Sequence, residues 1–155
     1  MPTSLRDEIK QTKPFKSLVQ EAQLNLERTA AVLFHRFANT FKAFDITPTQ
    51  YNVLRILRGA GTSGLCRNDV RDRLISQVPD VTRLLDRMVV AGLVARERDA
   101  TDRRLVTTRI TRQGLALLSR LDAPVAAAHQ HALGHMTNAQ LGSLIALLTL
   151  ARTPS

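Results

Sequence analysis

The chain has 155 residues, enough for one domain with an appended oligomerisation element, and 44% of them are hydrophobic. Its formal net charge of +9 favours a polyanionic partner, nucleic acid before an acidic membrane surface, with a basic surface kept for solubility as the alternative. The single cysteine excludes an intramolecular disulfide, no apolar run reaches the length of a membrane span, and residues 1–14 hold no apolar signal region, so we expect a cytoplasmic protein with no membrane partner.

Two helices are predicted in the first 61 residues. Apolar residues recur every three or four positions over residues 15–43, which predicts a helix that is long for a small domain and therefore packs beyond its own core. Thr47 and Gln50 form a capping box around Pro48, the first residue of the second helix. Gly61 is expected just beyond its end.

The next segment favours a short strand at Leu65–Cys66, a short helix over residues 68–74 and a further helix over residues 79–91. Ser76 is the expected cap of that last helix, and Pro79 is tolerated in its first turn. Apolar and charged residues fall on opposite sides of it. The residues expected to face inward are Val81, Leu84, Leu85 and Met88, and those expected to face outward are Asp80, Arg83, Asp86, Arg87 and Val90.

The period then changes from helical to alternating. The stretches "LVARER" and "RLVTTRI", separated by the polar "DATD", predict a two-stranded hairpin with a polar tip. Thr111 caps the helix that follows, and Pro124 is expected to kink or break it. Thr137 and Gln140 form a second capping box, which opens a final apolar helix that ends near Arg152.

Residues 68–91 match a helix-turn-helix, in which two helices are joined tightly and the second presents charge outward. A helix fits the major groove of B-form DNA and reads base edges from its N-terminal half. Arg83 is placed to reach a guanine edge and Arg87, one turn later, to reach phosphate. The alternative is an amphipathic core helix with a solvated, salt-bridged face. The DNA-contacting residues predicted on and just before this helix are Gln77, Pro79, Asp80, Thr82, Arg83 and Arg87.

The hairpin favours the DNA-binding interpretation, because a hairpin directly after a helix-turn-helix is a wing, whose tip follows the DNA backbone with an arginine in the minor groove. Residues 55–120 hold 14 arginines, no lysine and seven acids, and the planar fork of arginine suits phosphate. Arg103 and Arg104 are expected at the minor groove, whereas Arg96 and Arg98 share a strand face and are expected to follow one row of phosphates. The predicted wing residues are Arg96, Arg98, Arg103 and Arg104 at the DNA, and Asp99 and Asp102 as tip-holding partners of these arginines.

The stretches "ITPTQYNVLRILRGAG" and "VPDVTRLLDRMVVAGLVARERDATDRRLVTTRITRQGLALL" together resemble the MarR family of winged helix-turn-helix regulators, and Asp102-Arg103-Arg104 is similar to that family's wing signature. The resemblance implies a mainly α fold with a small β-hairpin wing and a helical dimerisation region. It places the DNA-binding region at 47–111 and the dimerisation region at 1–46 and 112–155. It also implies a homodimeric repressor on a pseudo-palindromic operator, relieved by a small apolar or phenolic effector.

Weaker signals leave two alternatives. His129, His131 and His135 suggest a metal-responsive regulator of the same fold, but no acid or cysteine in residues 123–155 completes a site, so neither a metal nor a cofactor is predicted. A basic RNA-binding or architectural module is disfavoured because the few aromatic residues lie mostly on apolar faces. Cys66 is expected to be a small buried residue. No catalytic motif is present, which predicts that the chain is not an enzyme.

Overall fold

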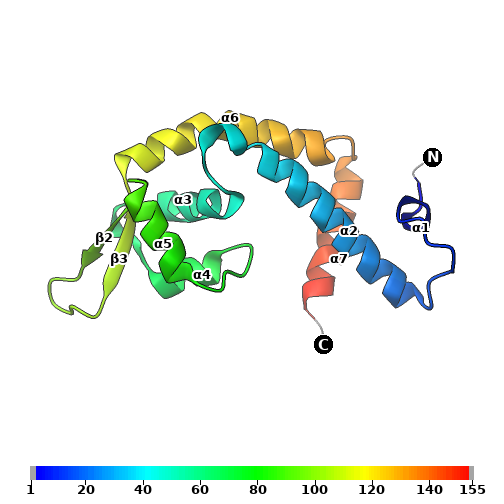
Figure 1. Cartoon of the computed structure of the whole chain (residues 1–155), viewed down its shortest axis with the longest axis horizontal. Helices are drawn as coiled ribbons and strands as arrows, with labels where there is room; N and C mark the ends of the chain where they lie inside the picture. Colours follow the sequence, from blue (N-terminus) through cyan, green and yellow to red (C-terminus); the bar gives the residue numbers. More distant parts are fainter. Residues whose placement is uncertain (1–2, 154–155) are drawn as a thin grey trace. The chain divides into compact units, whose positions relative to one another are not determined.

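The computed structural model describes residues 3–153, and Figure 1 labels its elements. The chain consists of two compact units, with the boundary in the sequence between Arg36 and Phe37. The fold is mainly helical, as predicted. None of the helices in the described residues combines the length and the hydropathy that a membrane crossing requires.

The first unit holds α1 (Leu5–Glu8) and most of α2 (Leu18–Asn39). Within this unit, an ion pair of 3.5 Å between Glu8 and Arg28 joins the two helices. The long first helix is confirmed, although it ends at Asn39 rather than near residue 43. A 3-10 turn, η1 (Lys42–Phe44), follows, and Asp45 has a positive φ of 51° that a continuing helix does not allow.

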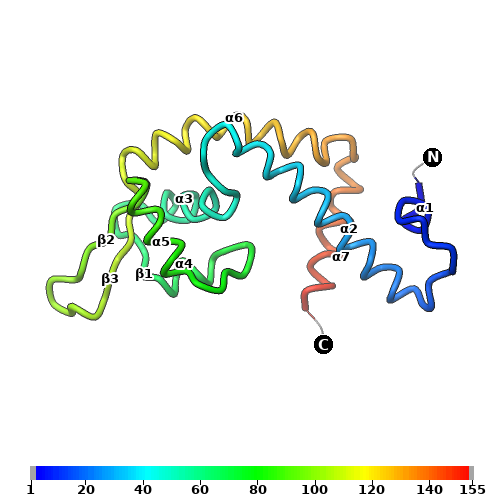
Figure 2. Tube along the Cα trace, viewed as in Figure 1, coloured from blue at the N-terminus to red at the C-terminus, as the bar shows by residue number. Residues whose placement is uncertain are grey.

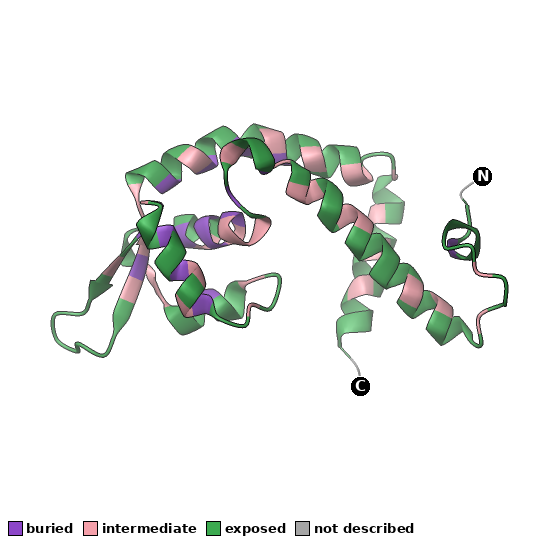
Figure 3. Ribbon diagram, in the orientation of Figure 1, coloured by how far each residue is buried: buried purple, intermediate pink, exposed green. Residues whose placement is uncertain are grey.

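The second unit is built on α3 (Pro48–Ala60), α4 (Arg67–Arg73), α5 (Val81–Val90), α6 (Arg112–Leu133) and α7 (Asn138–Arg152). Both predicted capping boxes, Thr47 with Gln50 and Thr137 with Gln140, are confirmed. The core of the second unit gathers buried residues mostly from α3, α5 and α6, and Figure 3 colours the buried positions along these helices. The largest fully buried core residues are Phe41, Leu54, Leu57, Leu85, Met88, Leu118 and Leu121.

Two details of the predicted helices are wrong. The cap of α5 is Asp80 and not Ser76, and the helix begins at Val81, after Pro79 rather than at it. Asp80 caps because its side chain accepts a hydrogen bond of 2.9 Å from the backbone N–H of Arg83. Proline also disfavours a helical conformation in the residue before it, here Val78, which argues against a helix capped at Ser76.

Helix α6 runs through Pro124 as one element, so of the two predicted outcomes, a kink or a break, the break does not occur. A proline inside a helix costs about 3 kcal/mol, because it removes one hydrogen bond and crowds the preceding turn. Burial of Leu121 and Val125 on either side of Pro124 anchors both halves in the core and offsets that cost.

The wing is a three-stranded antiparallel sheet rather than the predicted two-stranded hairpin, with β1 (Leu65–Cys66) joining β2 (Val94–Arg98) and β3 (Val106–Ile110) in the order β1-β3-β2 (Figure 2). Thr108 pairs with Arg96 on one side and with Leu65 on the other. The close approach of β1 needs Gly64, because a Cβ there would lie 2.6 Å from the Thr108 carbonyl oxygen.

Candidate nucleic-acid interface

Helix α5 is fixed to the core by one face and presents cations on the other. Val81, Leu85 and Met88 are buried, whereas Arg83 and Arg87 are exposed and lie four residues apart, on one side of the helix. Neither arginine forms an ion pair with any of residues 3–153. The outward face of α5 therefore carries two arginines that form no ion pair within the described residues.

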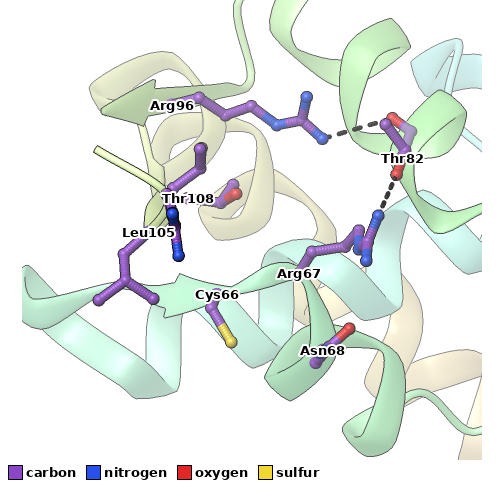
Figure 4. Close-up of a pocket in the computed structure, with 9 residues that line it drawn as sticks. Cys66, Arg67, Asn68, Thr82, Arg96, Leu105 and Thr108 are labelled. Carbon is purple, nitrogen blue, oxygen red and sulfur yellow. Dashed lines mark hydrogen bonds between the residues drawn. The ribbon is translucent and has the colours of Figure 1, made fainter. Parts of the chain in front are cut away.

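The N-terminal turn of α5 is held from two sides through Thr82 (Figure 4). Arg67 at the start of α4 donates a hydrogen bond of 3.2 Å to the Thr82 hydroxyl, and Arg96 of β2 donates one of 3.4 Å to the Thr82 carbonyl oxygen. Thr82 is partly buried. The hydroxyl that the sequence places at the DNA is thus engaged with α4.

Arg96 connects the wing to α5. Its guanidinium forms an ion pair with Asp86 of α5, and only 24% of its side-chain surface is exposed. Arg96 and Arg98 were predicted to contact one row of phosphates together. In the structure their roles differ, because Arg96 binds α5 while Arg98 is exposed.

The tip of the wing is ordered by two aspartates that bind backbone groups. Asp99 accepts hydrogen bonds from the Thr101 hydroxyl and from the backbone N–H groups of Thr101 and Asp102, and these bonds lower the pKa of Asp99 to about 2. Asp102 accepts one of 2.9 Å from the Arg104 backbone N–H. The two aspartates do hold the tip, but through these groups and not, as predicted, through arginine side chains.

Three wing arginines remain available to a partner. Arg98, Arg103 and Arg104 are exposed, and their side chains form no ion pair or hydrogen bond within the described part of the chain. The one glutamate of the wing, Glu97, is paired with Arg109, whose Nε also donates to the Thr62 carbonyl oxygen at 2.6 Å. The acids near the tip thus bind groups other than the side chains of these three arginines, which remain free of ion pairs in the described part of the chain.

The segment between α4 and α5 carries the remaining predicted contacts. Gln77 and Pro79 are exposed there, and Asp80 follows them as the cap of α5. Ile75 begins this segment, with its backbone N–H donating 3.0 Å to the Asn52 side chain of α3. That hydrogen bond ties the start of the turn to the core of the unit.

A pocket of about 370 Å³ lies between α4, α5 and the wing (Figure 4). Arg67 and Asn68 line this pocket but were not among the predicted site residues. The high charge of "CRNDVRDRL", the stretch that contains both, was the signal that could have identified them. Cys66 also lines the pocket. It is half-buried rather than buried, and its thiol donates a hydrogen bond of 3.1 Å to Asp69. The pocket lining is Cys66, Arg67, Asn68, Thr82, Arg96, Arg104, Leu105, Val106 and Thr108.

The histidines of α6 do not assemble into a metal site in the described residues. His129 stacks on the ring of Phe37, with centroids 5.3 Å apart and planes inclined by 13°. Within residues 3–153, no three side chains of histidine, cysteine or acid type lie close enough together to hold a metal ion. The structure therefore offers no support for the metal-responsive alternative.

Comparison with protein families and curated proteins gives consistent results. The model of the MarR family matches residues 44–105, which include α3, α4, α5, β1 and β2. The HTH-type transcriptional regulator FarR of Neisseria gonorrhoeae is 27% identical over 112 residues, which is 72% of this chain and 75% of that protein.

Solved structures extend the similarity to nearly the whole chain. A MarR transcription factor from Planctomyces limnophilus is 40% identical, with a TM-score of 0.68, over 88% of this chain and 99% of that one. BpsR of Bordetella bronchiseptica, whose DNA binding is regulated by 6-hydroxynicotinic acid, has a TM-score of 0.79 at 22% identity, over 92% of this chain and 100% of that one. The second likeness is one of fold.

Proposed function

Because this chain belongs to the MarR family of DNA-binding transcriptional regulators, we propose that α5 and the wing bind an operator in double-stranded DNA. The N-terminal half of α5 enters the major groove, and the tip of the wing lies at the adjacent minor groove. In this arrangement Arg83 reads a base, whereas Arg87 and the wing arginines contact the backbone. The protein is a regulator and not an enzyme.

One observation carries this proposal: the exposed arginines of α5 and the wing form no ion pair within the described residues, while the acids beside them bind other groups. Asp80 caps α5, Asp86 pairs with Arg96, and Asp99 binds the backbone of the tip. Exposed arginines without an ion pair, on a helix and on a neighbouring hairpin, favour the binding of a polyanion that contacts both elements. The unpaired arginines are Arg83, Arg87, Arg98, Arg103 and Arg104.

The functional form that we propose is a homodimer on a pseudo-palindromic site. Helices α2 and α7 each contain no fully buried residue. Each also leaves large apolar side chains exposed, an arrangement that favours coverage by a second copy. Two copies present two recognition helices to two half-sites. The exposed apolar residues are Leu18, Val19, Leu26 and Phe34 on α2, and Ile145, Leu147 and Leu150 on α7.

We further propose that the protein is a cytoplasmic repressor released by a small apolar or phenolic effector. The support is the family membership together with BpsR, whose DNA binding is regulated by 6-hydroxynicotinic acid, a small aromatic acid. Screening small phenols for release of bound DNA tests this part separately from DNA binding itself.

The DNA immediately upstream of the gene is the natural target to test first. Fluorescence anisotropy should show tight binding to a duplex from that region and much weaker binding to a scrambled duplex of the same composition. Equal binding to both would contradict a sequence-specific regulator of its own promoter, and no binding to either at low salt would overturn the proposed function as a whole.

A further inference from the structure

The pocket between α4, α5 and the wing is lined by three arginines and, among the described residues, by no aspartate or glutamate. Of its three arginines, only Arg96 has an acidic partner, Asp86. Arg67 donates only to the neutral hydroxyl of Thr82, and the side chain of Arg104 has no hydrogen-bonding partner among residues 3–153. Two guanidinium groups, one from α4 and one from the wing, thus line one pocket, and neither forms an ion pair within the described residues.

We propose that this pocket seats one phosphate of the DNA backbone, held by Arg67 from α4 and Arg104 from the wing. The inference rests on the proposed function and deepens it. A guanidinium offers a rigid fork of donors that matches phosphate oxygens, and Arg67 spends one N–H on Thr82 and keeps the rest. Asn68 adds an amide donor to the lining.

The walls of the pocket strengthen such a contact. Leu105 and Val106 are exposed apolar residues of the wing that line it beside the arginines. Apolar walls exclude water from an ion pair and so reduce its screening. The volume of about 370 Å³ exceeds what a single phosphate group needs, which leaves room for the adjoining sugar.

The contact between Arg67 and the phosphate also positions α5. Arg67 holds the Thr82 hydroxyl, and Thr82 directly precedes Arg83, the proposed base-reading residue. A phosphate bound to Arg67 therefore sets where the first turn of α5 lies along the backbone. Phosphate contacts fix register but carry no sequence information. Loss of Arg67 should then weaken a cognate and a scrambled duplex by similar factors.

A salt titration of four variants tests the shared phosphate. The variants are Arg67→Gln, Arg104→Gln, the double variant, and Arg73→Gln as the matched control. Arg67 and Arg104 are exposed, so both can be replaced without opening the core, and Arg73 is an exposed arginine of the same helix outside the pocket. The measured quantity is the slope of log K against log salt on one duplex.

One phosphate contact contributes about 0.9 to that slope, or about 1.8 for the two half-sites of a dimer. If both arginines hold the same phosphate, the double variant loses no more than about that amount, and each single variant loses most of it. The control Arg73→Gln should lose clearly less than Arg67→Gln. A double variant that loses about twice as much as either single variant would contradict the shared site.

Three further outcomes overturn the inference in distinguishable ways. A wild type that binds no duplex removes the proposed function and this inference together. A wild type that binds normally, with Arg67→Gln indistinguishable from Arg73→Gln, removes this inference alone. Inorganic phosphate that raises the melting temperature of the wild type but not of Arg67→Gln, at constant ionic strength and without DNA, while both proteins show the same salt slope on DNA, would identify a site for a free anion instead.

Discussion

Arg96 of β2 and Asp86 of α5 form an ion pair that links the wing to α5. Arg96 also donates to the backbone carbonyl of Thr82, so one guanidinium spans a full turn of α5. The Asp86 side chain is 58% exposed, and pairs of this kind typically contribute less than about 1 kcal/mol to stability. The consequence to look for is therefore the position of the wing, not the melting temperature.

Asp86→Asn separates positioning from simple charge. Removing an acid close to bound DNA should raise affinity for every duplex if only electrostatics matters. If the pair positions the wing, affinity for the cognate duplex should fall while affinity for a scrambled duplex stays the same or rises. Asp72→Asn on α4, where Asp72 pairs with its neighbour Arg71, is the control and should treat both duplexes alike. A parallel rise on both duplexes with Asp86→Asn would contradict the positioning role.

The order of the wing tip should depend on the ionisation of Asp99. Its pKa is lowered from the ordinary 3.8 to about 2, first by the Thr101 hydroxyl and then by the backbone N–H groups of Asp102 and Thr101. Because the folded pKa is lower, the stabilisation of the tip is present above about 3.8 and is lost as pH falls through about 2. Amide chemical shifts of Thr101 and Asp102 followed by NMR should titrate near pH 2.

Thr101→Val provides the matched variant for that titration. It removes the hydroxyl that lowers the pKa most and keeps the two backbone donors, so the midpoint should move up toward 3.8. Circular dichroism recorded at each pH separates a local change at the tip from unfolding of the chain. A wild-type midpoint near 3.8, or one that Thr101→Val leaves in place, would show that the tip is not organised by Asp99.

Assembly should depend on the apolar surface of α7. Ile145 is 65% exposed in one subunit, so Ile145→Glu leaves the core of the subunit intact but places a charge in the proposed dimer interface. Analytical ultracentrifugation at micromolar concentration should show a dimer for the wild type and a monomer for Ile145→Glu. Ile75→Glu, at a more exposed position between α4 and α5, should remain dimeric. A wild-type monomer that binds its operator tightly would contradict the proposed assembly.

Local features of the fold were predictable from the sequence because their causes are local. The two capping boxes need only residues three apart, Thr47 with Gln50 and Thr137 with Gln140. The stretches that form β2 and β3 show the alternating residue pattern of a strand within their own sequence. The cap of α5 was wrongly assigned to Ser76 because Asp80 was read only as an outward-facing residue. The restriction that Pro79 imposes on Val78 disfavours a helix capped at Ser76, and the structure has Asp80 as the cap.

Contacts between distant segments were not predictable. The ion pair of Asp86 with Arg96 and the hydrogen bond of Arg67 to Thr82 join residues that are 10 and 15 positions apart across turns whose geometry the sequence does not specify. The commitment of Arg96 to α5 could not be seen either, because on an isolated strand it shares its face with Arg98. The addition of β1 to the wing depends on the close approach at Gly64.

We propose that α5 reads the DNA sequence while the wing binds the DNA backbone. The test is the affinity of Arg83→Ala and of Arg104→Ala for a cognate and for a scrambled duplex. Arg83→Ala should cost about 1–3 kcal/mol on the cognate duplex and far less on the scrambled one. Arg104→Ala should weaken both duplexes by similar factors and reduce the salt dependence. If Arg83→Ala weakened both duplexes equally while Arg104→Ala alone erased discrimination, the assigned roles would be reversed.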